Sequence, residues 1–223
     1  MTKIFQYVII TERFFMEKFD EIYLYLSDLF ENAECELKFN SNYELLVAVI
    51  LSAQCTDKRV NEVTKRLFLV ANTPSKMLEL GQDKLEKMIY SCGFYKNKAK
   101  NIINMSKALL EKFNGEVPEN IDDLLTLDGV GRKTANVVIS TAFKGDAIAV
   151  DTHVFRVSNR LGLTNSTNPL DSEKQLMKVI PKDKWSDMHY KLVLFGRYNC
   201  KSRNPSCDTC KLTKYCKYYK ENK

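Results

Sequence analysis

The stretch LDGVGRKTANVVISTAFKGDAIAVDTHVFR, residues 127–156, contains the residues around which the rest of the chain is organised. Gly129 and Gly131 bracket a tight turn, because glycine accepts positive φ and lets another molecule approach the backbone closely. Lys133 follows in the first turn of an apolar helical segment, and a second apolar run leads to Asp151 at the start of another helix. The stretch therefore places two ionisable side chains at two helix starts.

The turn lies between a short helical segment and a longer one, which gives a helix–hairpin–helix pattern at about residues 121–143. Backbone amides at such a turn and at the following helix start have no partner within a helix, and the helix dipole favours an anion beside them. The turn can therefore hold a nucleic-acid phosphate without reading the base sequence. A plain connection between two helices is the alternative interpretation.

Lys133 and Asp151 are the candidate catalytic residues. A helix N-terminus disfavours an ammonium group, and burial against the apolar helix would also favour the neutral amine. A neutral amine can attack an electrophilic carbon and form a Schiff base. A carboxylate at Asp151 can act as a general base or stabilise a developing cation. The competing interpretations are an ordinary surface lysine and an ordinary aspartate N-cap.

Apolar residues elsewhere in the chain recur with helical spacing, and no alternating strand pattern is found. Residues 12–30 and 43–53 are predicted to form helices, and residues 85–92 carry apolar side chains at positions i, i+3, i+4 and i+7. Thr73 followed by Pro74 is typical of a helix start. We therefore predict an all-α fold made of many short helices.

The composition indicates an intracellular globular protein with a mild basic excess. The 223 residues are 44% hydrophobic, and Lys plus Arg exceed Asp plus Glu by 34 to 28, a net charge of +6. This excess is compatible with a polyanionic partner and equally with a solvated basic surface. No apolar run approaches the ~20 residues of a membrane span. The apolar residues 1–10 lack a signal-peptide cleavage site, so we expect a cytoplasmic protein, associated with the nucleoid if it is bacterial.

Four of the seven cysteines are close together near the C-terminus. They are Cys200, Cys207, Cys210 and Cys216. Four thiols within a short segment of an intracellular chain indicate a metal centre, because disulfides are disfavoured in that compartment. The spacing matches neither a ferredoxin pattern nor the paired CxxC of a zinc ribbon, so zinc and a [4Fe–4S] cluster both stay open. Lys201 and Arg203 make the intervening loop basic, as phosphate contacts require.

Several segments, in this order, resemble the endonuclease III family of DNA glycosylases. They are LSAQCTD (51–57), ANTP (71–74), NGEVPE (114–119), GVGRKTANVV (129–138), AVDTHVFRV (149–157), GRYNC (196–200) and the four-cysteine spacing. The resemblance extends from about residue 43 to residue 218. The hairpin, the aspartate and the cysteine loop are independent elements, which makes the resemblance specific.

The resemblance implies a two-lobed helix–hairpin–helix glycosylase fold with a C-terminal iron–sulfur loop. Residues 35–145 would form a six-helix barrel that includes the hairpin. Residues 1–34 and 146–223 would form a second, discontinuous helical domain with a [4Fe–4S] cluster at residues 200–216. Cys200, Cys207, Cys210 and Cys216 match the family's cluster ligands.

The implied reaction is base excision repair of DNA. An oxidised or ring-saturated pyrimidine is flipped out of the duplex into a pocket. Lys133 matches the family's nucleophilic lysine, which attacks the sugar and forms a Schiff base. Asp151 matches the catalytic aspartate. β-Elimination then cuts the strand 3′ to the abasic site, so the enzyme is both an N-glycosylase and an AP lyase.

The resemblance also assigns contacts to DNA. Gln54 matches a residue that fills the space left by the flipped base, Phe94 falls at an apolar wedge, and His153 falls near the flipped nucleotide. The predicted contacts to the DNA backbone are Gly129, Val130, Gly131, Arg132, Lys201 and Arg203. The implied partner is double-stranded DNA with damaged pyrimidines or abasic sites, bound by a monomer.

Two positions depart from the family's usual pattern. Asp128 stands where proline is common before the first hairpin glycine, and Phe94 is bulkier than the common leucine. An adenine-mismatch glycosylase is one alternative function, disfavoured by Lys133 because that branch lacks the nucleophilic lysine. A non-catalytic DNA-binding module clamped by a metal is another, disfavoured by the presence of both Lys133 and Asp151.

Overall fold

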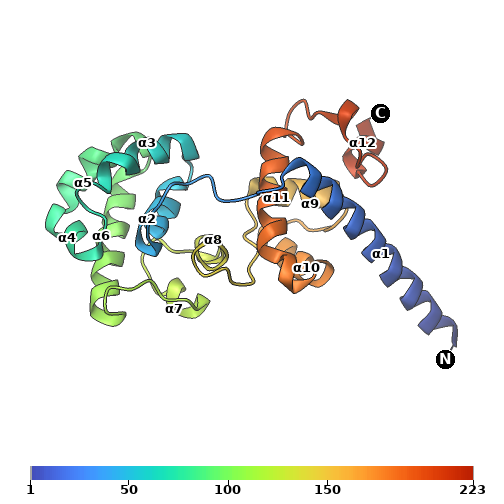
Figure 1. The fold of residues 1–223 in the computed structure, drawn as a ribbon, viewed down its shortest axis with the longest axis horizontal. Coiled ribbons are helices and arrows are strands. Elements are labelled where there is room, and N and C mark those ends of the chain that lie inside the picture. Colours follow the sequence, from blue (N-terminus) through green and yellow to red (C-terminus); the bar gives the residue numbers. More distant parts are fainter. Residues whose placement is uncertain (1, 223) are drawn as a thin grey trace. The chain divides into compact units, whose positions relative to one another are not determined.

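A computed structural model describes the backbone of residues 2–222 and the side chains of residues 16–222. Every regular element in this range is a helix, so the predicted all-α fold is confirmed (Figure 1). The chain divides into two compact units. Residues Cys35–Ala147 form the continuous unit, and Met1–Glu34 together with Ile148–Lys223 form the discontinuous unit.

The continuous unit is built around a helix that is buried on nearly all sides. Its helices are α2 (Asn42–Ser52), α3 (Asp57–Leu67), α4 (Pro74–Leu80), α5 (Gln82–Ile89), α6 (Tyr95–Lys112), α7 (Ile121–Leu125) and α8 (Arg132–Ala142), with a 3₁₀ turn, η1 (Tyr90–Cys92), after α5. Helix α2 packs against α3, α6 and α8. Because a helix in this position has apolar neighbours on nearly all sides, the mostly apolar sequence at residues 43–53 is explained, and the helix predicted there is confirmed.

Side-chain caps mark the start of four helices of the continuous unit, α2, α3, α4 and α7. Thr73 Oγ1 accepts a hydrogen bond from the Lys76 amide at 3.3 Å, and Pro74 occupies the first turn, as predicted. The helix expected over residues 85–92 is wrong at its end, because α5 stops at Ile89 and η1 follows. The last carbonyls of a helix have no amide partner within it, and tightening into a 3₁₀ turn is a common way to end.

The discontinuous unit joins an N-terminal helix to the C-terminal half of the chain. Its elements are α1 (Thr2–Leu29), α9 (Thr152–Arg160), α10 (Pro169–Val179), η2 (Lys182–Lys184), α11 (Trp185–Tyr198), η3 (Cys207–Thr209) and α12 (Lys217–Asn222). Phe19, Ile22 and Leu26 of α1 are buried in a core shared with α9 and α11. Helices α9 and α11 approach closely at Gly196, where an added Cβ would come within 2.8 Å of the His153 Cβ.

Helix α1 begins at Thr2, earlier than the predicted start at residue 12. Phe19, Ile22 and Leu26 form its buried face, and the helix predicted over residues 12–30 is confirmed except at its start. The side chains before residue 16 lie outside the described residues. Across the described residues, no helix has both the length and the apolar character that crossing a bilayer requires.

Candidate functional site

The hairpin turn between α7 and α8 is closed by its own backbone and held by apolar anchors. The Val130 amide donates to the Leu127 carbonyl at 3.1 Å, and both side chains are buried. Gly129 has φ +79°, and an added Cβ would meet the Asn101 side chain of α6 at 2.9 Å, so only glycine fits. Gly131 is exposed, and no atom lies within 4 Å of the place of its missing Cβ. The start of α8 is therefore open to an approaching ligand.

Asp128, unexplained by the sequence, has a partner on α6. Its Oδ2 accepts a hydrogen bond from Asn104 Nδ2 at 2.6 Å. This bond and the contact of Gly129 with Asn101 attach the hairpin turn to one face of α6. The Asp128 side chain therefore attaches the hairpin turn to α6.

Lys133 lies in the first turn of α8, directly after the open turn. The expected burial against the flanking helix is wrong, because Lys133 is exposed, and so is Arg132. The buried face of α8 is formed by other residues, among them Ala135, Asn136 and Val138. The helix thus packs with one face and presents its first two residues to solvent.

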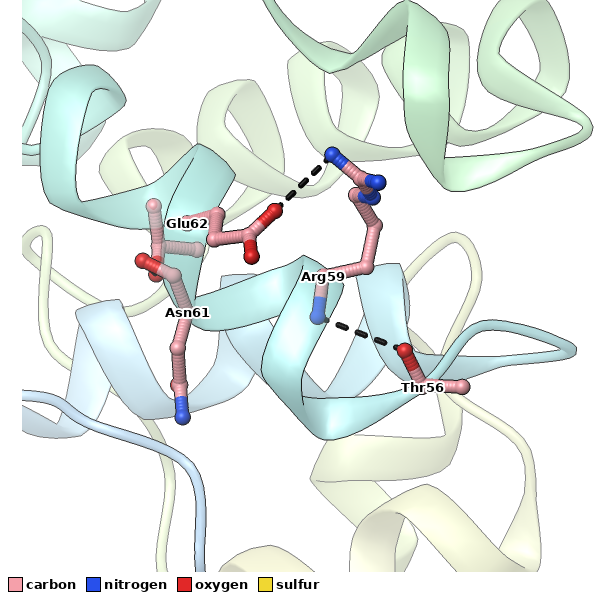
Figure 2. Close-up of polar contacts among 5 residues, drawn as sticks. Thr56, Arg59, Asn61 and Glu62 are labelled. Carbon is pink, nitrogen blue, oxygen red and sulfur yellow. Dashed lines mark hydrogen bonds and ion pairs between the residues drawn. The ribbon is translucent and has the colours of Figure 1, made fainter.

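Gln54 lies in the turn between α2 and α3, with its side chain exposed. Its φ of 53° is in the left-handed region, which a residue other than glycine adopts only where its surroundings hold it. Beyond it, Thr56 Oγ1 accepts a hydrogen bond from the Arg59 amide at 3.3 Å, and Arg59 Nη1 pairs with Glu62 Oε2 at 2.8 Å (Figure 2). The turn therefore presents Gln54 outward beside a capped helix start.

Phe94 is the N-cap residue of α6. Its φ is 46°, and its side chain is 65% exposed, which is unusual for a large apolar residue. Its carbonyl accepts the first backbone hydrogen bond of α6, from the Lys98 amide at 3.0 Å. Gln54 and Phe94 thus share an uncommon backbone conformation and an outward-facing side chain.

Asp151 caps α9 in the discontinuous unit. Its Oδ1 accepts hydrogen bonds from the amides of His153 and Val154, both at 2.8 Å. Asp151 is thus the N-cap of α9, as one interpretation predicted, and the two hydrogen bonds fix the orientation of its carboxylate. His153 is half-buried, and its Nδ1 lies 3.3 Å from Arg156 Nη2.

Two arginines on α9 hold the loop that begins at Cys200. Arg156 donates to the carbonyls of Gly196 at 2.7 Å and Cys200 at 3.1 Å, and burial lowers its pKa. Arg160 donates to the Cys200 Sγ at 3.4 Å and to the Lys201 carbonyl at 2.8 Å, with its guanidinium 3.9 Å from the Tyr218 ring centroid. Helix α9 therefore carries Asp151 at one end and fixes the cysteine loop with the other.

The four C-terminal cysteines line one hollow that opens to solvent. Leu161, Phe195 and Tyr218 are among its other lining residues. Burial raises the pKa of the Cys210 and Cys216 thiols, and the neighbouring cysteines raise it further. Within residues 16–222, no three ligand side chains converge closely enough to hold a single metal ion. Lys201 and Arg203 are exposed on the same loop.

The candidates thus form two groups. The continuous unit carries Gln54, Phe94, the hairpin residues 129–132 and Lys133. The discontinuous unit carries Asp151, His153, Lys201, Arg203 and the four cysteines. In the continuous unit α6 contacts the hairpin turn, and in the discontinuous unit α9 begins after Asp151 and holds the cysteine loop.

Comparisons with known proteins agree on one family. The pattern of the HhH-GPD superfamily base excision DNA repair proteins matches residues 47–182. Endonuclease III of Bacillus subtilis (strain 168) is 51% identical over 193 residues, which is 86% of this chain and 88% of that protein. The chain belongs to the endonuclease III family.

Solved structures of the family extend the likeness to the fold. A non-covalent endonuclease III–DNA complex matches with a TM-score of 0.89 and 48% identity, over 93% of this chain and 97% of that one. A trapped endonuclease III–DNA covalent intermediate, the estranged-adenine complex, matches with a TM-score of 0.88 and 48% identity, over 92% and 98%. The predicted family, the helix–hairpin–helix glycosylase fold and the class of enzyme, a base excision DNA glycosylase and lyase, are confirmed.

Sequence reasoning missed several residues that shape these groups in this member of the endonuclease III family. Asn101 and Asn104 hold the hairpin, and Arg156 and Arg160 hold the cysteine loop. Each looks like an ordinary polar residue on a helix surface in the sequence. Helical spacing carries no signal for these roles, because the partners lie between 24 and 44 residues away along the chain.

Proposed function

We propose that this protein excises oxidised or ring-saturated pyrimidines from duplex DNA and cuts the strand 3′ to the resulting abasic site. The observation that carries the proposal is the exposure of Lys133 in the first turn of α8, directly beside the open start of that helix at Gly131. A phosphate bound at the turn would place the sugar backbone next to the amine. This arrangement suits a nucleophile that must reach a sugar carbon of bound DNA.

In the proposed reaction, the Lys133 Nζ lone pair attacks C1′ of the damaged nucleotide. The bond between C1′ and the base breaks, and the base leaves with the electron pair and takes up a proton. Nζ loses one proton, the C1′–O4′ bond of the sugar ring breaks and O4′ takes up a proton, which leaves an iminium between Nζ and C1′, the Schiff base. Loss of a proton from C2′ then expels the 3′ phosphate by β-elimination. Asp151 would stabilise the positive charge that develops on the sugar.

The proposed DNA contacts are of two kinds, contacts to phosphates and contacts at the position of the flipped nucleotide. The amides of Gly129, Val130 and Gly131, the Arg132 side chain, and Lys201 and Arg203 would contact phosphates. Gln54 and Phe94 would occupy the duplex at the flipped nucleotide, and His153 would lie near it. We also propose that the protein acts as a monomer and, in a bacterium, on nucleoid DNA in the cytoplasm.

We propose that the four C-terminal cysteines bind a [4Fe–4S] cluster. A tetrahedral zinc site with Zn–S bonds of about 2.3 Å needs its sulfurs about 3.8 Å apart. In a [4Fe–4S] cluster each thiolate binds a different iron, so the sulfurs stand around a larger object. Four cysteines that line one hollow from separate positions along the loop can each bind a different iron of such a cluster. The hydrogen bond from Arg160 to the Cys200 Sγ suits a sulfur that carries negative charge.

The proposed activity is tested by incubating the purified protein with duplex DNA that contains a ring-saturated thymine or an abasic site, with borohydride present. We expect release of the damaged base, strand cleavage and a covalent protein–DNA adduct, because borohydride reduces the Schiff base. Absence of the adduct on abasic DNA would reject the lyase assignment. Release of adenine from a mismatch without an adduct would favour the mismatch glycosylase, and binding without chemistry would favour the non-catalytic module.

DNA binding is expected to depend on salt through the cysteine loop. Each neutralised phosphate contributes a slope of about −0.9 to the dependence of log K on log salt concentration. Replacing Lys201 and Arg203 with alanine should therefore flatten the slope by about 2, with little change in the kind of lesion excised. Fluorescence anisotropy over a salt series measures it.

The matched control removes the same number of positive charges from a different part of the same unit. Lys174 and Lys178 are exposed on α10 of the same unit, and replacing both with alanine also removes two positive charges. The control should leave the slope nearly unchanged. Equal slopes for the two double variants would mean that net charge, and not the loop, governs binding.

A further inference from the structure

Lys98 is a buried lysine that none of the proposed steps uses. It lies in the first turn of α6 and is only 5% exposed. Its Nζ donates hydrogen bonds to three backbone carbonyls: Leu51 at 2.8 Å, Ala53 at 2.7 Å and Cys92 at 2.7 Å. An ammonium has three donors, so these acceptors use all of them.

The three carbonyls belong to two separate turns. Leu51 and Ala53 close α2 immediately before Gln54, and Cys92 ends η1 two residues before Phe94. The Cys55 and Cys92 side chains of these two turns also lie near each other, since burial first and then the neighbouring Cys55 raise the pKa of the Cys92 thiol. Lys98 thus joins the two turns that carry Gln54 and Phe94.

The bridge coincides with two uncommon backbone conformations. Gln54 has φ 53° and Phe94 has φ 46°, although neither residue is glycine. Such conformations persist where the surrounding structure fixes them, and they occur often at functional sites. Hydrogen-bonded carbonyls next to each residue provide that restraint. Ala53 directly precedes Gln54, and the Phe94 carbonyl itself accepts the Lys98 amide at 3.0 Å.

Burying an ammonium group whose hydrogen-bond acceptors are all carbonyls costs free energy. Burial lowers the pKa of Lys98, which reflects the penalty of taking its charge out of water. An apolar side chain would fill the same volume without that penalty. What an apolar side chain cannot do is bind three converging carbonyls from two turns.

We propose that Lys98 is a positioning residue that holds Gln54 and Phe94 at a fixed spacing, so that both enter the duplex together when the damaged base leaves it. This inference rests on the proposed function, in which Gln54 and Phe94 contact the DNA. Both side chains are exposed above an anchored backbone, and that combination suits a rigid wedge. Their spacing matters most where a paired base must be displaced and least where no base remains to be flipped.

The test replaces Lys98 with methionine, which keeps length and loses the donors, and compares two single-turnover rates. Excision of a ring-saturated thymine paired with adenine should fall roughly 10²-fold, as expected when contacting groups are displaced by about 1 Å. Borohydride trapping on a preformed abasic site should stay within about twofold, the usual margin for an independent site. Lys107→Met, on an exposed lysine of the same helix, is the matched control and should change neither rate.

A double-mutant cycle separates positioning from general damage to the fold. In a chain that already carries Gln54→Ala and Phe94→Ala, Lys98→Met should slow excision by no more than about twofold, because there is no wedge left to position. The same loss of rate in both backgrounds would overturn the proposal. If Lys98→Met does not fold, Lys98→Arg enters the cycle, since a planar guanidinium keeps the charge but cannot direct three donors from one atom. Wild-type protein that neither excises nor traps would instead overturn the proposed function.

Discussion

Replacing Lys133 with alanine is expected to abolish the covalent adduct with abasic DNA and to lower base excision by roughly 10⁶-fold, as the loss of a catalytic nucleophile does in other enzymes. The reason is chemical, since no other group of this helix start can form an iminium with the sugar. DNA binding should persist, because the turn from Gly129 to Gly131 that grips phosphate remains. Gel assays after borohydride reduction, and anisotropy with a non-cleavable abasic analogue, measure the two properties separately.

Lys84→Ala is a suitable control for this variant. Lys84 is also exposed and also lies in the first turn of a helix, α5, within the same unit. It should trap abasic DNA as the unmodified protein does. Normal trapping by the Lys133→Ala protein would show that another amine is the nucleophile, and sequencing the adduct would identify it.

Replacing Cys210 with serine should remove the visible absorbance that the proposed [4Fe–4S] cluster gives the protein. It should also destabilise the discontinuous unit. A serine oxygen would bind one iron more weakly than the Cys210 thiolate, so the cluster would be lost. The loop from residue 200 to residue 216 would then no longer be held by the cluster. Metal sites contribute to folding free energy, so we expect the unfolding midpoint to fall by roughly 10 °C. Metal analysis, visible absorbance and thermal unfolding followed by circular dichroism measure the change.

The control for the cysteine variant is Cys35→Ser, because Cys35 lies far from the cluster segment in sequence and belongs to the continuous unit. It should keep the iron and the visible absorbance. A colourless unmodified protein that carries one zinc per chain would reject the iron–sulfur proposal. Full iron content after Cys210→Ser would reject this cysteine as a ligand.

Much of the fold follows from local sequence signals. The apolar run at residues 43–53 predicts a buried helix, and Thr73 with Pro74 predicts a helix start, because a cap and a burial pattern act over a few neighbouring residues. The end of α5 was harder to predict. Apolar spacing continues to Cys92, while the backbone changes to a 3₁₀ turn that spacing cannot reveal.

The residues of the candidate site also differ in whether local sequence signals predict them. The turn at Gly129 and the cap at Asp151 are local, so the sequence predicts where they lie. The exposure of Lys133 depends on which face of α8 packs, and the prediction of burial there was wrong. Lys98 reads in the sequence as one of many surface lysines, because its acceptors on Leu51 and Ala53 are more than forty residues away.

The division of the chain into a continuous and a discontinuous unit has a consequence for the order of events on the ribosome. The continuous unit, Cys35–Ala147, has all of its residues as soon as Ala147 has emerged, so its core can form while the rest is still being made. Helix α1 is synthesised first but must wait for α9 and α11 before Phe19, Ile22 and Leu26 are covered. The apolar face of α1 therefore stays uncovered through most of translation. During that time it is a surface that a chaperone would protect.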